Sequence, residues 1–310
     1  MTPTNSSFVL PPGLHVFERG WLSANNILFT GGEQTALVDS GYCTHAEQTL
    51  ALVKEVLKGQ PLDLLVNTHL HSDHCGGNAL LQSAYPGLRT LIPPGHADEV
   101  ARWDGLALTH ETTGQLCPRF SFSGTLPPGS ALTLGQQRWE IHAAGGHDPH
   151  SIVLFQPEAR TLLSADALWE NGFGVIFPEL DGEEGFTEVG LTLDLIESLK
   201  PDLVVPGHGP VFRYGPEVMA RARERLDFFA KHPEKHALHG LKVLLKFKLL
   251  EVQHQQLESF IDWAASTPYF VTIRQRFFDR ETIKPWLISL CDSLVKSRVA
   301  RIESGVIINA

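Results

Sequence analysis

The sequence predicts a layered α/β fold in which two β-sheets lie between helices, followed by a mainly helical C-terminal segment. Strand-like and helix-like stretches alternate through the first two thirds of the chain, which is typical of such layered proteins. After Tyr214 the hydrophobic periodicity is nearly all helical. At 310 residues, 43% of them hydrophobic, the chain is long enough for two domains. We expect an αββα domain over residues 1–214 and a helical domain over residues 215–310.

The chain opens with three short β-rich runs, which Gly20 and the Gly31-Gly32 pair separate. They predict an antiparallel meander. A helix with Leu50, Val53 and Leu57 on one face follows, and then a compact apolar strand that runs into Thr68. These elements form a β-α-β unit with histidines at its strand end. The expected strands are 14–17, 26–29, 36–38 and 63–66, and the expected helix is 45–57.

The rest of the first domain continues the alternation. We expect helices at 78–84, 96–106 and 186–199 and strands at 88–92, 131–134, 139–142, 151–155, 161–163 and 203–205. In the second domain we expect helices at 216–231, 236–249, 254–265 and 281–296 and a hairpin over 299–310. Helices closed by a short hairpin predict a winged-helix-like domain, and helices followed by an irregular end are the alternative.

The composition of the chain limits the cellular compartments in which we expect the protein. No apolar run approaches the roughly 20 residues that cross a bilayer. The first ten residues lack the basic and apolar regions of a secretory signal, and the four cysteines form no CxxC pair. We therefore expect a cytoplasmic protein without a membrane partner, and the sequence makes no prediction of its oligomeric state. Residues 1–214 carry 10 Lys and Arg against 24 Asp and Glu, and residues 215–310 carry 15 against 11.

The strongest chemical signal is a run of donor side chains that follows the strand at 63–66. His69, His71, Asp73 and His74 lie within six residues, and Gly76-Gly77 follow them. On a loop that leaves a buried strand, His69 and His71 would converge on one cation while Asp73 and His74 turn toward a second. Imidazole and carboxylate donors suit zinc, iron or manganese.

Three further donors lie at the ends of predicted strands. His147 precedes the strand at 151–155, Asp166 follows the strand at 161–163, and His208 follows the strand at 203–205. Each residue alone would be a weak signal, because Asp often caps a helix and His often occupies a turn. Together and in this order they strengthen the prediction of a metal site.

With these motifs, and with Asp39 in Leu37-Val38-Asp39-Ser40-Gly41, the sequence resembles the metallo-β-lactamase superfamily over about residues 14–212. The resemblance implies an αββα fold with a C-terminal winged-helix-like domain, near in architecture to glyoxalase II. It implies that His69, His71 and His147 bind one metal, that Asp73, His74 and His208 bind a second, and that Asp166 bridges the two. It also implies that Asp39 orients the histidine loop.

Two divalent metals, zinc above iron or manganese, would activate a bridging water as hydroxide, and Asp73 would steady or accept its proton. No GxSxG occurs, so a serine nucleophile has little support. We expect Asp73 and Asp166 to be catalytic. His150 stands where relatives often have Gly or Glu, and it is the candidate for an acid beside the substrate.

The substrate is less well defined, because fold alone does not specify it. The Gly-rich, apolar loop from Trp169 to Pro178, including Phe173, is a candidate substrate wall. The acidic first domain favours a small anionic thioester or related activated ester over a nucleic acid. Two alternatives stay open, namely an endoribonuclease or phosphodiesterase guided by the basic C-terminal segment, and a persulfide dioxygenase with a single iron.

Overall fold

Two six-stranded sheets form the centre of the computed structural model, which describes residues 10–310. The expectation about a secretory signal rests on residues that lie almost entirely outside this range. The first sheet contains β1 (Leu14–Phe17), β2 (Asn26–Phe29), β3 (Ala36–Val38), β4 (Leu64–Val66), β5 (Arg89–Ile92) and β6 (Gly124–Thr125), in that order. The second contains β12 (Phe212–Arg213), β11 (Leu203–Pro206), β10 (Thr161–Ala165), β9 (Ile152–Gln156), β8 (Gln137–Ala143) and β7 (Ala131–Leu134), in that order.

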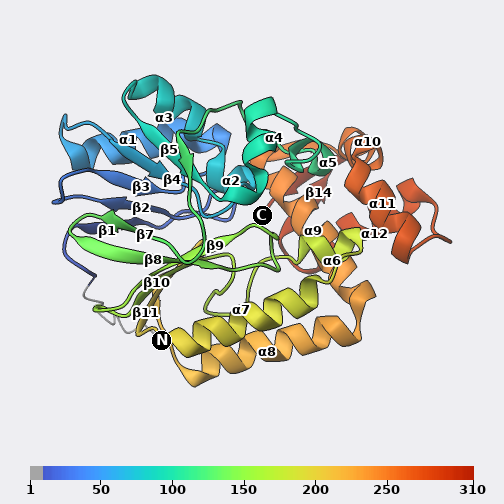
Figure 1. The fold of residues 1–310 in the computed structure, drawn as a ribbon. Helices are drawn as coiled ribbons and strands as arrows, with labels where there is room; N and C mark the ends of the chain where they lie inside the picture. Colours follow the sequence, from blue (N-terminus) through green and yellow to red (C-terminus); the bar gives the residue numbers. More distant parts are fainter. Residues whose placement is uncertain (1–9) are drawn as a thin grey trace, which may run out of the picture.

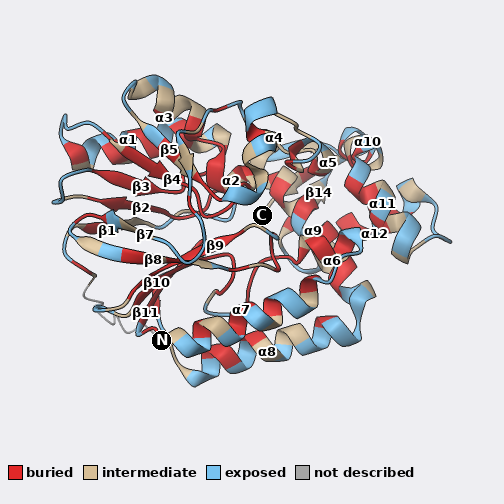
Figure 2. Ribbon diagram, viewed as in Figure 1, coloured by how far each residue is buried: buried red, intermediate tan, exposed pale blue. Residues whose placement is uncertain are grey.

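Helices cover the outer face of each sheet (Figure 1). α1 (Ala46–Leu57) and α3 (Asn78–Ala84) pack on the first sheet, and α7 (Gly185–Leu199) and α8 (Pro216–Lys231) cover the second. Successive side chains of β2 point to opposite faces of the sheet and explain this arrangement. Leu28 packs under the helices, whereas Ile27 and Phe29 pack between the sheets. Figure 2 shows the strands buried and the outer helices exposed on one side. The predicted four-layer αββα fold is confirmed.

Strand direction places the ends of several strands at one edge. β1, β2 and β3 form the predicted antiparallel meander, whereas β3 to β6 run parallel. In the second sheet β10 and β11 are also parallel. Polar side chains that follow parallel strands therefore meet at the same edge of the sheet.

The C-terminal helices share a separate hydrophobic cluster with a small three-stranded sheet. The predicted hairpin is present and is joined by a third strand, at residues 254–256, where the sequence predicted a helix start. A helix beginning at Pro268 was not predicted, although proline favours the first helical turn. The helices are α9 (Pro233–Val252), α10 (Leu257–Ser266), α11 (Pro268–Phe277) and α12 (Ile283–Lys296), and the strands are β13 (His254–Gln256), β14 (Ala300–Glu303) and β15 (Val306–Asn309).

The proposed division after residue 214 falls just before α8, which packs on α7 in the outer layer of the second sheet. The separate cluster contains Leu241 and Leu244 of α9 and also Val175 and Leu180 from the first 214 residues. None of the helices between residues 10 and 310 is long and apolar enough to cross a bilayer.

Candidate metal centre

The histidine loop leaves β4 at the edge of the first sheet. His69 and His71 lie on the loop, and the short helix α2 (Ser72–Cys75) carries Asp73 and His74. Gly76 lets α2 pack tightly, since a Cβ there would lie 2.5 Å from the carbonyl oxygen of Ser72. The glycine pair noted in the sequence therefore has a steric reason.

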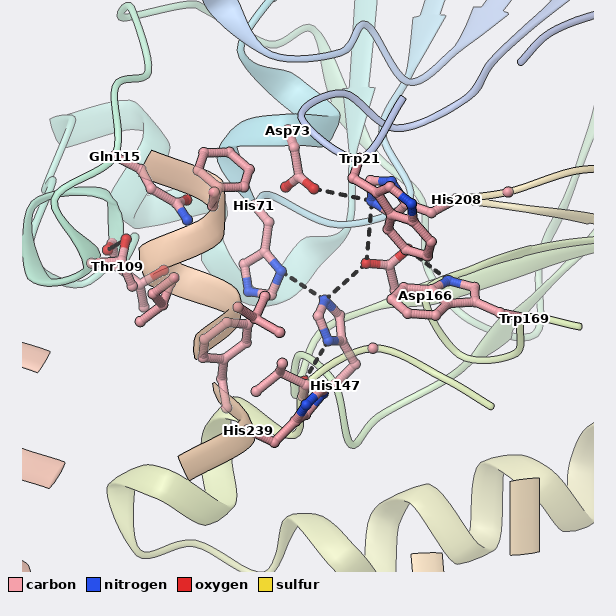
Figure 3. A pocket seen from close by; sticks show the side chains of 18 of the residues that line it. Trp21, His71, Asp73, Thr109, Gln115, His147, Asp166, Trp169, His208 and His239 are labelled. Carbon is pink, nitrogen blue, oxygen red and sulfur yellow. Dashed lines mark hydrogen bonds and ion pairs between the residues drawn. The ribbon is translucent and has the colours of Figure 1, made fainter. Parts of the chain in front are cut away.

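The second sheet supplies the other three donors. His147 precedes β9, Asp166 follows β10, and His208 follows β11. β10 ends at a register irregularity where Ala165 has a φ of 46°, a left-handed conformation that non-glycine residues rarely adopt. This turn brings Asp166 between the two sets of histidines. The structure thus brings together all seven predicted donors from loops of both sheets, as Figure 3 shows for five of them.

His69, His71 and His147 form a first group whose ligand atoms lie within 4.8 Å of one another. Nδ1 of His71 lies 2.8 Å from Nε2 of His147 and 3.1 Å from Nε2 of His69. His147 Nδ1 donates to the carbonyl oxygen of Val175 at 2.5 Å, so its Nε2 carries a lone pair. Nitrogen lone pairs that converge in this way fit a cation between them.

Asp73, His74, Asp166 and His208 form a second group of the same compactness. His208 Nε2 lies 3.1 Å from Oδ2 of Asp73, and His74 Nε2 lies 4.0 Å from the same oxygen. Asp39 accepts a hydrogen bond from His74 Nδ1 at 2.8 Å, which leaves Nε2 of His74 without a proton when the ring is neutral. That Nε2 atom is buried and has no hydrogen-bond partner. An orphaned buried nitrogen facing carboxylates fits a second cation site.

Asp166 touches both groups. Its Oδ2 lies 3.3 Å from Nε2 of His147 and 3.8 Å from Nε2 of His208, and its Oδ1 lies 3.5 Å from Nε2 of His74. The carboxylate therefore occupies the place that a bridging ligand would need.

Asp39 supports the loop from the first sheet, as the sequence implied. Its Oδ1 accepts the backbone N–H of Thr68 at 2.9 Å, and its Oδ2 accepts the Thr68 hydroxyl at 2.8 Å as well as His74 Nδ1. Thr68 Oγ1 in turn lies 3.1 Å from Nδ1 of His69. One buried carboxylate thus orients two imidazoles.

Electrostatics agree with a site for positive charge. Burial would raise the pKa of Asp166, but the neighbouring His208, His74 and His147 hold it well below its usual value. Burial would lower the pKa of His74, yet Asp166, Asp39 and Asp73 raise it well above the usual value. Ionised carboxylates that favour a cation at His74 are the environment that a divalent metal requires.

Two histidines of the first group, His69 and His71, are held neutral. Burial, together with the neighbouring imidazoles, lowers the pKa of His69 well below its usual value and that of His71 to about 4. Neutral imidazole is the form that binds metal, so at neutral pH these rings need not lose a proton to bind one.

The two groups open into a cavity of about 380 Å³. His71, Asp73, His147, Asp166 and His208 line its base. Trp21 stacks on the ring of His208 at a centroid distance of 5.5 Å, and Trp169 meets the same ring edge-on at 5.6 Å. Two indoles therefore wall one side of the base (Figure 3).

The C-terminal helices form the opposite wall, which is largely apolar and which the sequence did not predict. It includes Val243, Leu244, Phe247 and Tyr269. Arg225 on α8 and His239 on α9 add polar groups, with Arg225 Nη2 lying 2.9 Å from His239 Nε2. Burial lowers the pKa of His239 to about 4, helped by Arg225 and Lys242, so its neutral ring accepts the Arg225 N–H.

The predicted substrate residues separate into two classes. Trp169 lines the cavity. Phe173 is 1% exposed in the core of the second sheet, and the His150 ring packs on His96 at 4.4 Å, so neither belongs to the walls that residues 10–310 form. Phe177 lies in the predicted loop and lines the cavity, with its ring 5.1 Å from that of His71, although the sequence did not single it out. Its apolar neighbours in the Trp169–Pro178 loop were the only sequence signal for it.

Comparisons with known proteins agree with this geometry. The family model described as the metallo-beta-lactamase superfamily matches residues 19–208. A hydroxyacylglutathione hydrolase of Brucella anthropi is 25% identical over 179 residues, which are 58% of this chain and only 56% of that protein. A beta-lactamase-like protein 2 homolog of Drosophila melanogaster is 25% identical over 238 residues, 72% of this chain and 74% of that one. The crystal structure of a metallo-beta-lactamase family protein from Thermus thermophilus matches with a TM-score of 0.58 at 18% identity, covering 97% of this chain and 100% of that one.

Proposed function

Because the chain belongs to the metallo-β-lactamase superfamily, whose members are generally metal-dependent hydrolases, we propose that it is a dinuclear hydrolase of a small anionic thioester or related activated ester. The observation that carries the proposal is the pair of donor groups at the base of one cavity. They share Asp166, and the lone pairs of their imidazoles converge. Zinc is the metal that we assign to this nitrogen and oxygen donor set, with iron as the alternative.

Two divalent cations held by these groups would lower the pKa of water and polarise the substrate carbonyl. The chain itself supplies the proton acceptor. The Asp73 side chain is 16% exposed whereas that of Asp166 is 6% exposed, so Asp73 is the donor carboxylate that incoming water reaches more easily. Asp73 would take the proton of the nucleophile. Asp166 would fix the position of the two donor groups relative to each other.

A thioester fits the rest of the cavity. A thiolate is a good leaving group that needs little protonation, so the reaction requires no acid at the position of His150. The apolar wall on α9 and the two indoles would accept the acyl or thiol portion, and they would exclude water from it.

An anionic substrate group is supported by Arg225. Its guanidinium lies above the rings of Phe173 and Phe229, at 5.5 Å and 5.2 Å from their centroids. No carboxylate of the described residues pairs with it, and its Nε is buried without a hydrogen bond. A half-buried arginine that faces a cavity and lacks a counter-ion favours a carboxylate or phosphate on the ligand.

The basic segment gives less support to a nucleic acid. The basic residues that suggested RNA binding are Arg221, Arg223, Arg225, Lys242, Lys246 and Lys248. Five of them make contacts within the chain: Arg223 and Lys248 pair with carboxylates, and Arg221, Arg225 and Lys246 contact neutral groups. Side chains that are already engaged within the chain have less to offer to a polyanion.

The test is steady-state hydrolysis by the full chain, loaded separately with zinc and with iron and compared with a chelated control. Acyl-coenzyme A thioesters and glutathione thioesters are matched against single-stranded RNA. A thioester kcat/KM of order 10⁴ M⁻¹s⁻¹ or more with RNA intact supports the proposal. Chelator-sensitive RNA cleavage without thioester turnover would replace it with a nuclease, and oxygen consumption with a persulfide by the iron form alone would replace it with a dioxygenase.

A further inference from the structure

A third set of potential metal ligands lies apart from the cavity and has no part in the proposed hydrolysis. Cys75 ends α2, His110 begins the short helix α5 (His110–Thr113), and Cys117 lies on the loop after it. One ligand atom from each residue lies within 4.8 Å of the other two. Cys75 is completely buried, His110 is 5% exposed, and Cys117 is half-buried.

The distance between the two sulfur atoms is the first argument. Cys75 Sγ and Cys117 Sγ are 3.7 Å apart. A disulfide would bring them to about 2.05 Å. Two thiolates on one tetrahedral zinc, each at about 2.3 Å from the metal, lie about 3.8 Å apart. The observed separation matches the edge of a zinc tetrahedron.

The orientation of His110 is the second and independent argument. Its Nε2 lies 3.0 Å from the carbonyl oxygen of Leu70. A carbonyl can only accept, so Nε2 carries the proton and Nδ1 carries a lone pair. Nδ1 is buried and has no hydrogen-bond partner. A histidine that donates one N–H to a backbone carbonyl while its other nitrogen is bare has the arrangement usual for a metal-bound imidazole.

We propose that Cys75, His110 and Cys117 bind a third metal ion, a zinc that connects α2 to the segment around α5. Two thiolates and a neutral imidazole balance the charge of Zn²⁺, and both thiol protons pass to solvent when the metal binds. A water molecule would complete the tetrahedral coordination. The site joins the segment around α5 to α2, which carries Asp73 and His74.

Cobalt substitution tests the proposal independently of catalysis. The seven donors of the proposed catalytic centre contain nitrogen and oxygen only, so a thiolate-to-cobalt charge-transfer band in the near ultraviolet reports on the cysteine site alone. We expect this band in the full-length cobalt protein and its loss in Cys117→Ser. We also expect Cys117→Ser to contain one zinc equivalent fewer per chain by elemental analysis.

Cys291→Ser is the matched control, because Cys291 is a buried free thiol within the C-terminal cluster. It should keep both the band and the zinc. His110→Gln is a second variant at the site, and it should weaken zinc retention against a chelator at least tenfold. A parent protein without the band, or equal zinc contents in the parent and Cys117→Ser, overturns the proposal. So does a Cys75–Cys117 disulfide that persists when zinc and a thiol reductant are supplied together.

Discussion

Asp39 Oδ2 lies 2.8 Å from Nδ1 of His74, and Asp39 itself has a φ of 57°. Asp is among the few residue types that tolerate this left-handed conformation. This turn places the Asp39 carboxylate within hydrogen-bond distance of both Thr68 and His74. Removing its charge should loosen the metal centre without removing a donor.

We expect Asp39→Asn to lower the affinity for catalytic metal by about 10 to 100-fold, because the amide supports the imidazole less well. Competition against a graded chelator measures this change. Asp63→Asn is the matched control, since Asp63 makes the same kind of contacts to Thr35 N and Oγ1 but lies at the opposite end of β4. Equal losses in both variants would show that Asp39 acts through general stability.

Asp166→Ala should remove the group shared by the two donor sets. We expect at least one metal equivalent fewer per chain than in the parent and a fall in kcat of about 10³-fold or more, since alanine cannot span two cations. Elemental analysis of the purified variant gives the first quantity. A variant that retained the parent's metal content would contradict the bridging role of Asp166.

Arg225→Met should raise KM for an anionic thioester and change kcat little. Hydrogen bonds to charged groups contribute about 1.5 to 3 kcal/mol, which corresponds to roughly 10 to 100-fold in kcat/KM. Arg223→Met lies on the same helix but pairs with Asp194 and Glu197 away from the cavity, so it should leave KM unchanged. With a neutral thioester, the KM of Arg225→Met should equal that of the parent. An equal rise in KM for both substrates would contradict the anion-binding role of Arg225.

Acid should destabilise the contact between α9 and the loop after Asp166. Burial, aided by His239 and Arg225, lowers the pKa of His236 from 6.5 to about 3. Between these two pKa values His236 is protonated in the unfolded chain but neutral in the folded chain. The free energy of unfolding therefore falls as the pH drops from about 6.5 toward 3. By pH 5 the loss from this group is about 2 kcal/mol.

Denaturant unfolding at a series of pH values checks this expectation. His236 Nε2 accepts the N–H of Ile176 at 3.1 Å, and glutamine offers an oxygen near the same position without titrating. His236→Gln should therefore flatten the acid slope. His232→Gln, at an exposed site at the start of α9, should not alter it. Parallel slopes for the parent and His236→Gln would show that His236 does not drive the acid loss.

The sequence predicted the layers and the run from His69 to His74 because both depend on local signals. The resemblance to the family assigned His147, Asp166 and His208 to the same centre. The donors follow strand ends, and the periodicity of the strands could be read directly. The cavity walls could not be predicted in this way. Trp21 contacts His208, and α9 lines the same cavity as His71, only after distant segments pack. Nothing in the residues around Trp21 or Val243 indicates these positions.

The same limit applied to the third ligand set. Cys75 and Cys117 are separated by 42 positions, without the short spacing that marks a zinc motif. Only the fold brings His110 beside them. Without a CxxC pair, the cysteines were not candidate metal ligands in the sequence.

The carbonyl that receives His147 Nδ1 and the N–H that His236 accepts belong to one peptide group, between Val175 and Ile176. A peptide group is planar and stiff, so its two ends cannot turn independently. A single peptide group therefore connects α9 to His147, which is one of the candidate ligands. A change in the position of His236 would change the hydrogen bond that orients the His147 ring.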